Sequence, residues 1–429
     1  MENKIKLSSE QKEIFDILDK TSDNVYITGK AGTGKSLLLQ HFVNNTSKKA
    51  VVLAPTGVAA LNVEGQTIHS FFGFSPEVQD PKIHREIQVF YKTKEILKKI
   101  DAIIIDEVSM VSVDLMESIN IKCQKARRNE LPFGGLQIIC FGDLFQLPPV
   151  VSDREIHRYL NDTYGGTFFF NAPVFENCKL KIYELENIFR QKDNKFKEIL
   201  NKIRVGNNSL EIIDTINSRL QVPIPKEGFI TLAGRNETVS RINQKKLDEI
   251  NAEQHTYIAN IQGDIKESIF PTEKELHLKI GAQIMMLVND KNDRWVNGTL
   301  GIISDLNEDV IRVIIDDVEH AIDRYTWNKC KYFYDAEAKT LEREIISSFT
   351  QFPVRLAWAV TIHKSQGKTY QSVLLDLSDG AFDTGQTYVA LSRCTSLDTL
   401  YLKEKIYPDD IMVNSQVIEF MNQAKVVKV

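Results

Sequence analysis

A glycine-rich loop, Gly29–Ser36, constrains this chain more than any other feature. Its sequence fits the pattern G-x-x-x-x-G-K-[ST], and it lies between an apolar strand-like run, Asn24–Thr28, and a helix-like run, Leu37–Val43. Glycines let backbone N–H groups curl around phosphate oxygens, and a helix N-terminus adds partial positive charge. The strand–loop–helix context therefore predicts a nucleoside triphosphate site, and a chance glycine-rich turn is the alternative.

The residue types in this loop predict how ATP and Mg²⁺ are held. The ammonium group of Lys35 is expected to contact the β- and γ-phosphates, and the hydroxyl group of Ser36 is expected to coordinate Mg²⁺. The rest of the loop is expected to surround the phosphates through its backbone: Gly29, Ala31, Gly32, Thr33 and Gly34.

An acidic pair follows a second apolar run, Ile103–Ile105. Asp106 and Glu107 come directly after it, at what we expect to be the carboxyl edge of a sheet, where such folds bind ligands. We expect Asp106 to bind Mg²⁺, directly or through water, and Glu107 to orient and deprotonate the attacking water. Alone, the pair would more often be a solvated strand end, but with the phosphate loop upstream the catalytic interpretation is favoured.

Gln11 has two open interpretations. Its carboxamide has both a donor and an acceptor, which suits the edge of adenine. Ser8 and Gln11 also have the spacing of a helix capping box, and the two roles are compatible.

The first half of the chain alternates apolar strands with helical stretches, which is typical of a parallel α/β sheet. The strands are expected at Asn24–Thr28, Lys49–Thr56, Asp101–Asp106 and Leu136–Gly142. A second α/β unit begins near Arg190, with elements expected at Phe229–Leu232, after Asn236, at Ser372–Leu377 and at Leu400–Lys403.

The segment Ile261–Ser348 has a different texture, with short strand-like runs and an Asn-Gly turn signal at Asn297 and Gly298. We interpret it as a small β-barrel inserted in the second α/β domain. The expected domains are 1–189, with a small wedge insertion at about 64–78, then 190–260 plus 349–429, and the barrel at 261–348.

Composition excludes several protein classes. There is no long uncharged apolar run that would predict a membrane span, and the first residues do not resemble a signal peptide. Five widely spaced cysteines predict a reduced cytosolic protein without a zinc site. The formal net charge of -5 argues against a protein that coats nucleic acid, so DNA contacts would have to be local.

Further motifs occur along the chain in the expected order. One of them, Phe141–Val150, contains G-D-x-x-Q-L-P-P-V and resembles motif III of superfamily-one helicases. The others resemble motif Ia and its extension, then motifs IV, V and VI: Ala54–Ala60, Thr67–Phe72, Asn187–Gln191, Thr361–Gly367 and Tyr388–Arg393.

The chain is most similar to the petite integration frequency (PIF) family of DNA helicases. Phe352–Val360 leads directly into motif V as in that family, Asn297–Gly301 resembles its barrel turn, and Asp114–Arg128 lies where its signature helix is found. The resemblance implies two RecA-like domains, ATP hydrolysis at their interface and 5′→3′ movement on single-stranded DNA. It also implies roles in DNA repair, DNA recombination and telomere maintenance.

The resemblance also assigns roles to single residues. Arg393 is the first candidate for an arginine finger and Arg190 is the second, because a guanidinium group neutralises charge on the transferring phosphoryl oxygens. A surface salt bridge is the alternative for either arginine. Gln146 is expected to sense the γ-phosphate, and Gly367 is expected to approach the ribose or a phosphate closely.

The DNA track is expected along motifs Ia and V. Its hydrogen-bonding residues are Thr56, His69, Ser70, Thr361, His363 and Lys364. Phe71 and Phe72 are candidates for base stacking or for a strand-separating wedge, with burial in the core as the alternative. A basic run is either a solvated helix face or a DNA contact: Lys122, Lys125, Arg127 and Arg128. Trp295 and Trp327 are candidates for the barrel core.

The expected function is an ATP-dependent 5′→3′ DNA helicase that translocates on single-stranded DNA and couples hydrolysis to domain closure. The alternative is a nucleotide-dependent switch that binds single-stranded DNA without unwinding. The expected partners are single-stranded DNA and single/double-strand junctions, with G-quadruplex DNA as an open candidate. We expect a monomer without a membrane, in a bacterial-type cytosol or nucleoid.

Overall fold

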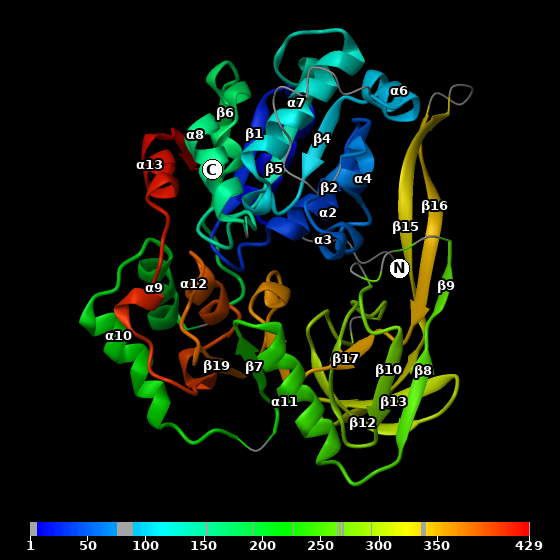
Figure 1. The fold of residues 1–429 in the computed structure, drawn as a ribbon, viewed down its shortest axis with the longest axis vertical. Helices are drawn as coiled ribbons and strands as arrows, with labels where there is room; N and C mark the ends of the chain where they lie inside the picture. Colours follow the sequence, from blue (N-terminus) through cyan, green and yellow to red (C-terminus); the bar gives the residue numbers. More distant parts are fainter. Residues whose placement is uncertain are drawn as a thin grey trace. The chain divides into compact units, whose positions relative to one another are not determined.

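The computed structural model describes residues 7–428, apart from 75–88, 152, 192, 226, 264, 266, 268–269, 293 and 336–339. The chain divides into two compact units. The first consists of Met1–Phe189, Asn328–Ile346 and Asn414–Val429, and the second consists of Arg190–Trp327 and Ser347–Val413. Figure 1 shows the chain coloured from its N-terminus to its C-terminus.

The first unit is built on a parallel sheet of seven strands in the order β21-β6-β1-β5-β4-β2-β3. The predicted parallel α/β class is therefore confirmed. The strands are β1 (Asn24–Gly29), β2 (Ala50–Ala54), β3 (Gln66–Thr67), β4 (Ala102–Ile105), β5 (Gln137–Phe141), β6 (Leu180–Leu185) and β21 (Val426–Lys428). The four strands predicted in the first half of the chain are all present, each within a few residues of its expected bounds.

Helices cover this sheet because its central strands are apolar on both faces. Residues of β4 and β5 are completely buried, and α1 (Ser9–Lys20) and α2 (Lys35–Asn45) contribute Ile14, Leu38 and Phe42 to one core with the strands. The other helices of the unit are α3 (Gly57–Asn62), α4 (Ile68–Phe72), α6 (Tyr91–Lys99), α7 (Val113–Arg127), α8 (Arg154–Tyr164) and α13 (Ser415–Gln423).

The C-terminus departs from the sequence expectation. We expected the chain up to residue 429 to stay in the second domain, but β21 pairs in parallel with β6 of the first sheet. Phe420 of α13 stacks on Phe170 with 4.2 Å between ring centroids, and the Gln416 side chain donates to the carbonyl of Gly165 at 2.6 Å. Such long-range strand pairing leaves no local signal in the sequence.

The second unit contains a four-stranded parallel sheet in the order β18-β7-β19-β20. Its strands are β7 (Ile230–Ala233), β18 (Ala359–Thr361), β19 (Val373–Asp376) and β20 (Leu400–Leu402). Its helices are α9 (Asn194–Arg204), α10 (Leu210–Asn217), α11 (Asn236–Asp248) and α12 (Gln386–Leu391). The expected strand–helix–strand elements of this unit are thus present.

Antiparallel strands occupy the segment predicted as a barrel, 261–348, but they begin at Gln254 and end at Leu356, and Asn328–Ile346 belongs to the first unit. Five of them form a sheet in the order β14-β13-β12-β11-β17. The antiparallel strands are β8 (Gln254–Ile258), β9 (Asn260–Gln262), β10 (Glu275–Lys279), β11 (Gln283–Met286), β12 (Leu300–Leu306), β13 (Val310–Ile315), β14 (Val318–Asp323), β15 (Tyr325–Asp335), β16 (Thr340–Gln351) and β17 (Val354–Leu356). Trp295 belongs to their apolar core and Trp327 is also buried, as the core interpretation required.

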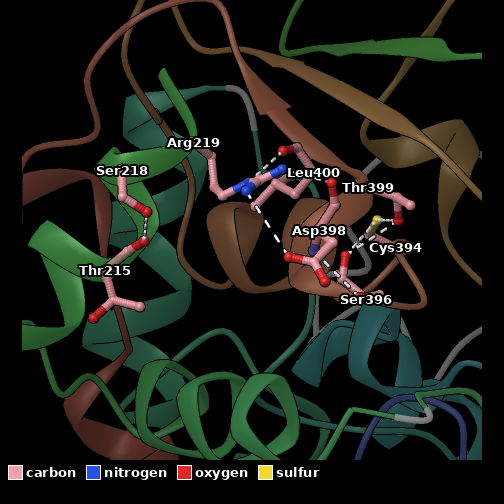
Figure 2. A network of polar contacts seen from close by, with 8 residues as sticks. All are labelled: Thr215, Ser218, Arg219, Cys394, Ser396, Asp398, Thr399 and Leu400. Carbon is pink, nitrogen blue, oxygen red and sulfur yellow. Dashed lines mark hydrogen bonds and ion pairs between the residues drawn. The ribbon is translucent and has the colours of Figure 1, made fainter. Parts of the chain in front are cut away.

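A polar network secures the chain around the last strand of the second sheet (Figure 2). The Arg219 guanidinium donates to the carbonyl of Leu400 at 3.0 Å and to that of Asp398, and the Cys394 thiol lies 3.2 Å from the Thr399 hydroxyl. These bonds fix the turn between α12 and β20. Among the helices that the structure describes, none is long and apolar enough to cross a membrane.

Candidate nucleotide and DNA sites

The predicted phosphate loop has the conformation that its glycines allow. It connects β1 to α2, and the φ angles of Gly29, Gly32 and Gly34 are 154°, 84° and 80°. A Cβ atom at Gly29 would lie 2.8 Å from the carbonyl oxygen of Leu185, so only glycine fits there. Backbone N–H groups of such a loop, at the start of a helix, form an anion site.

Lys35 lies back on this loop. Its ammonium group donates to the carbonyl oxygens of Gly29 at 2.6 Å and Lys30 at 3.2 Å. Ser36 follows in the first turn of α2, with an exposed side chain. Both side chains are therefore placed at the loop where a phosphate and its metal ion would be expected.

Gln11 performs the capping role that the sequence suggested. Ser8 and Gln11 form a capping box at the start of α1, with the Gln11 backbone N–H donating to Ser8 Oγ and the Ser8 N–H donating to Gln11 Oε1. The Gln11 amide nitrogen also lies against the phosphate loop, 3.4 Å from the carbonyl of Thr33 and 3.3 Å from that of Gly34. The adenine role stays a prediction, now with the amide placed beside the loop.

Phe189 is a residue of this site that sequence reasoning missed. Its backbone N–H donates to the carbonyl of Gly32 at 2.9 Å, and a Cβ at Gly34 would lie 3.9 Å from its ring. The ring is 58% exposed. An aromatic ring held in solvent beside the phosphate loop and Gln11 is suited to stack on a nucleotide base. Its place next to Arg190 in the predicted motif IV was the available signal.

Asp106 and Glu107 stand at the carboxyl end of β4, as predicted. Loss of solvation, followed by the negative charge of Glu107, raises the pKa of Asp106 to about 7, while the positive charge of Lys35 opposes this shift. Glu107 has a φ of 50°, in the left-handed region that non-glycine residues rarely occupy. Backbone strain of this kind costs about 1–3 kcal/mol and often occurs at active sites.

Gln146 lies in the loop that follows β5. It is buried, and its side-chain amide donates to the carboxylate of Asp143 at 3.2 Å. Asp143 is itself buried and also receives the Phe145 N–H. The amide is thus oriented by a neighbouring carboxylate, as a residue that responds to a phosphate would need.

In the second unit, both candidate arginine fingers bind the loop that contains Gly367. Arg190 donates to the carbonyls of Gly367 at 3.2 Å and Ser392 at 3.3 Å. Arg393 donates to the carbonyls of Lys368 at 3.2 Å and Val389 at 2.8 Å. The sequence predicted these three residues from separate motifs, and the structure brings them together.

The two arginines differ in exposure. Arg393 is 1% exposed, whereas Arg190 is half-buried. Loss of solvation, and then the positive charge of Arg393, lower the pKa of Arg190 to about 9. The surface salt-bridge alternative is wrong for Arg393, because its guanidinium is buried among carbonyl oxygens.

Three of the expected DNA residues lie at the carboxyl edge of the first sheet. Thr56 caps α3 by accepting the N–H of Ala59 at 3.2 Å, and the exposed Ser70 in α4 accepts from Gln66 at 2.9 Å. His69 is half-buried, and loss of solvation lowers its pKa. Contact of these residues with DNA stays a prediction.

The adjacent phenylalanines are in the core. Phe71 is 4% and Phe72 is 0% exposed, and their rings pack edge to face with centroids 4.9 Å apart. The structure therefore supports the core alternative rather than stacking or a wedge. The backbone of their short helix, α4, accepts hydrogen bonds from Thr93 of α6 and Lys122 of α7, contacts that the sequence of α4 alone does not reveal.

The basic run of α7 is also partly structural. Lys122 is buried, donates to the carbonyl of Phe72 at 2.6 Å and lies 4.4 Å from the centre of the Phe74 ring. Arg127 donates to the carbonyls of Leu97 and Gly134, both at 2.8 Å. Lys122 and Arg127 therefore connect α7 to neighbouring segments. The solvated-face alternative applies only to Lys125 and Arg128.

A cavity of about 480 Å³ in the second unit unites the expected DNA residues of motif V. Its lining consists of Gly234, Arg235, Asn236, Glu237, Thr361, His363, Lys364 and Phe382. The rings of His363 and Phe382 are stacked at 15°, with centroids 6.4 Å apart. Sequence reasoning missed Arg235, Asn236 and Phe382. The end of β7 at Ala233 was the signal for the first two, whereas nothing local marked Phe382.

In the part of the chain that the structure describes, acidic side chains are not gathered into a complete metal site. Among the described residues, no group of three or more His, Cys, Asp or Glu side chains is placed to hold a metal ion. Magnesium bound to a nucleotide needs only one or two protein ligands, because phosphates and water supply the others. Burial, and then the negative charge of Glu107, raise the pKa of Asp106, and a divalent cation bound there would favour its ionised form.

Comparisons with known proteins agree with this geometry. The family model described as PIF1-like helicase matches residues 6–212, and that described as DNA helicase Pif1, 2B domain, matches residues 263–306. The ATP-dependent DNA helicase Pif1 of Bdellovibrio bacteriovorus is 33% identical, over 98% of this chain and 93% of its own length.

Solved structures agree as well. Pif1 from Bacteroides sp. in complex with ADP-AlF4 is 36% identical, with a TM-score of 0.90 over 97% of this chain and 96% of that one. Bacteroides Pif1 bound to ssDNA is 37% identical, with a TM-score of 0.70 over 97% of this chain and 96% of that one. The chain therefore belongs to the family of PIF1-like helicases, and it is an ATP-dependent DNA helicase.

Proposed function

We propose that this helicase moves 5′→3′ along single-stranded DNA and separates the duplex or folded DNA ahead of it. The observation that carries the proposal is that each unit contains its own preorganised set of the expected catalytic side chains. The first unit holds the phosphate loop, Lys35 and the Asp106–Glu107 pair. The second unit holds Arg190 and Arg393 on the loop of Gly367. The polarity rests on resemblance to the PIF family.

Each residue of the first unit would have a distinct task in hydrolysis. Lys35 would exchange its loop carbonyls for phosphate oxygens, and Glu107 would orient the attacking water. Ser36 and Asp106 would hold Mg²⁺, which neutralises the phosphate charge when bound. Gln11 and Phe189 would hold the adenine, one by hydrogen bonds and the other by stacking.

The arginines of the second unit would complete the site during each turnover. A guanidinium that reaches the γ-phosphate stabilises the charge that develops in the transition state. Arg190 and Arg393 both bind the segment that follows the expected DNA residues His363 and Lys364. A movement of either arginine would therefore be transmitted to the DNA track through four or fewer intervening residues, which is how we propose that hydrolysis drives translocation.

The track itself would recognise phosphates and not sequence. In the second unit, Arg235, His363 and Lys364 line the same cavity, and Phe382 offers a half-exposed ring. In the first unit, Thr56 and Ser70 would continue the track. Bacteroides Pif1 has been solved bound to ssDNA, which supports a single strand as the occupant.

Strand displacement tests this proposal directly. A duplex with a 5′ single-stranded tail, a duplex with a 3′ tail and a blunt duplex are each incubated with ATP and Mg²⁺. We expect unwinding of the 5′-tailed duplex alone, and none by the Lys35→Ala variant. Unwinding from the 3′ tail would overturn the polarity. DNA-stimulated ATP hydrolysis without unwinding of any substrate would favour the alternative, a nucleotide-dependent switch.

Three further proposals concern the surroundings of the enzyme. We propose that it is a monomer in solution, that folded G-quadruplex DNA is among its substrates, and that it works in the bacterial-type cytosol or nucleoid, where its DNA is found. Sedimentation at several concentrations tests the first. Unwinding of a 5′-tailed quadruplex with and without a stabilising potassium ion tests the second.

A further inference from the structure

The first turn of α6 lies at the edge of the first sheet where the DNA residues of motif Ia are found. Thr56 lies two residues after the end of β2, and α4 follows β3 directly, so both stand at the carboxyl edge of this parallel sheet. The Thr93 hydroxyl in α6 donates to the carbonyl of Phe71 in α4 at 3.0 Å. The start of α6 is therefore fixed beside α4 and Ser70.

Two aromatic side chains are exposed at this position. Phe90 precedes α6 and is 62% exposed, and Tyr91 is its first residue and is 77% exposed. Among the described residues, Tyr91 is the most exposed of the large apolar and aromatic side chains. Two adjacent exposed aromatic side chains at the start of a helix are suited to an interaction site.

The Phe90 ring packs against neighbouring residues of the first unit. A Cβ at Gly73 would lie 2.1 Å from the Phe90 ring, so the ring rests directly on the backbone of Gly73. The ammonium group of Lys122 lies 6.0 Å from the centre of the same ring. Phe90 thus has a defined orientation before any ligand arrives, which reduces the entropy lost on binding.

The charge around this pair is positive, although the whole chain is acidic. Helix α6 contains four lysines and one glutamate in nine residues. A hydrogen bond from Lys98 lowers the pKa of Glu95, and the charges of Lys98, Lys99 and Lys94 lower it further. Lys92 is exposed next to Tyr91. Positive charge on this helix would attract a polyanion, and the exposed rings would suit a polyanion that carries aromatic groups.

We infer that Phe90 and Tyr91, with Lys92 and Lys94, form a further contact site for single-stranded DNA. An unpaired base would stack on the exposed ring of Tyr91, and the two lysines would contact the flanking phosphates, without reading sequence. Bases within a duplex are already stacked on one another, so an aromatic pair of this kind fits a single strand. The inference rests on the proposed function and adds a site outside the helicase motifs.

Binding of a fluorescent oligothymidylate tests the site, measured by anisotropy across a range of salt concentrations. We expect Tyr91→Ala to weaken binding by about 5-fold or more, and Tyr91→Phe to restore it, because only stacking is required. Lys92→Ala with Lys94→Ala should reduce the slope of log K against log salt by about 1.4, since each single-strand phosphate contact contributes ~0.7.

Leu210→Ala is the matched control, because Leu210 is also the first residue of its helix and is 71% exposed. It should bind the oligonucleotide as the natural chain does. At saturating DNA the Tyr91→Ala variant should hydrolyse ATP at the natural maximal rate and need more DNA to reach half of it. Unchanged single-strand affinity of Tyr91→Ala overturns the inference, even if forked DNA binds more weakly. The wild-type unwinding experiment separates this result from failure of the proposed function.

Discussion

Arg190 donates a hydrogen bond to the carbonyl oxygen of Gly367 at 3.2 Å, so a candidate arginine finger is tied to the last residue of the predicted DNA-binding motif V. Arg393 binds the same loop through the carbonyls of Ser365 and Lys368. Any displacement of these guanidinium groups would pull on backbone that lies next to His363 and Lys364. We propose that this link within the second unit couples hydrolysis to movement on DNA.

Replacing Arg190 tests its role as a finger. Arg190→Ala should lower the DNA-stimulated kcat for ATP by about 10³-fold, because loss of an arginine finger has effects of this size, while ATP binding persists. Arg190→Lys should not rescue it, since an ammonium group lacks the planar fork. Arg312→Ala, in an exposed ion pair with Glu319, is the control. Natural turnover in Arg190→Ala would exclude Arg190 as a finger.

Arg393 calls for a second measurement. Its guanidinium is buried and donates to several carbonyl oxygens, so Arg393→Ala leaves these acceptors without their donor. We expect this variant to retain ATP binding, to stop hydrolysis and to melt at a lower temperature than Arg190→Ala. Loss of ATP binding with unchanged hydrolysis per bound ATP would show that Arg393 is not a finger.

Glu107 should be needed for hydrolysis and not for folding. Glu107→Gln keeps the side-chain shape and the left-handed backbone, so its melting temperature should match that of the natural chain, while single-turnover hydrolysis is lost. Glu107→Gly should also be inactive but more stable by about 1 kcal/mol, because glycine adopts this φ without strain. Hydrolysis by the Gln variant would assign the base elsewhere.

Phe189 is expected to contribute to the affinity for the adenine base of ATP. Phe189→Ala removes an exposed ring beside Gly34, and we expect the KM for ATP to rise about 3- to 10-fold with little change in kcat, in line with the energy of one aromatic contact. Phe189→Tyr should behave as the natural chain does. The KM for inorganic tripolyphosphate, which has no base, should not respond to either change; an equal rise there would indicate a damaged phosphate loop instead.

Lys122 should make the stability of the first unit depend on pH. Burial, and then the positive charge of Lys125, lower the pKa of Lys122 to about 8, from 10.5. Between these pH values the unfolded chain binds more protons than the folded chain, so this residue makes the free energy of unfolding rise as pH increases from about 8 to 10.5.

Lys122→Met keeps the length of the side chain and removes both its charge and its bond to Phe72. Urea denaturation of both proteins, followed by circular dichroism, should show the natural chain gaining stability relative to the variant over this pH range. A constant difference between the two proteins would mean that Lys122 titrates at its ordinary pKa.

Local sequence was enough to predict the elements on which the proposed nucleotide site is built, because each is a short continuous segment. The phosphate loop, the capping box at Ser8 and Gln11, and the strand that ends at Asp106 each depend on neighbours within a few residues. Buried strands such as β1 and β5 were predictable for the same reason, since an uninterrupted apolar run between turns already specifies a strand with two covered faces.

Tertiary structure decided which side chains face water and which distant segments meet. Phe71 and Phe90 are the same residue type, yet the fold buries the first and leaves the second exposed. Only the fold places Phe189 over Gly34, joins Arg190 to Gly367 and adds β21 to the first sheet. Burial and pairing depend on residues far apart in the chain, and no local pattern contains that information.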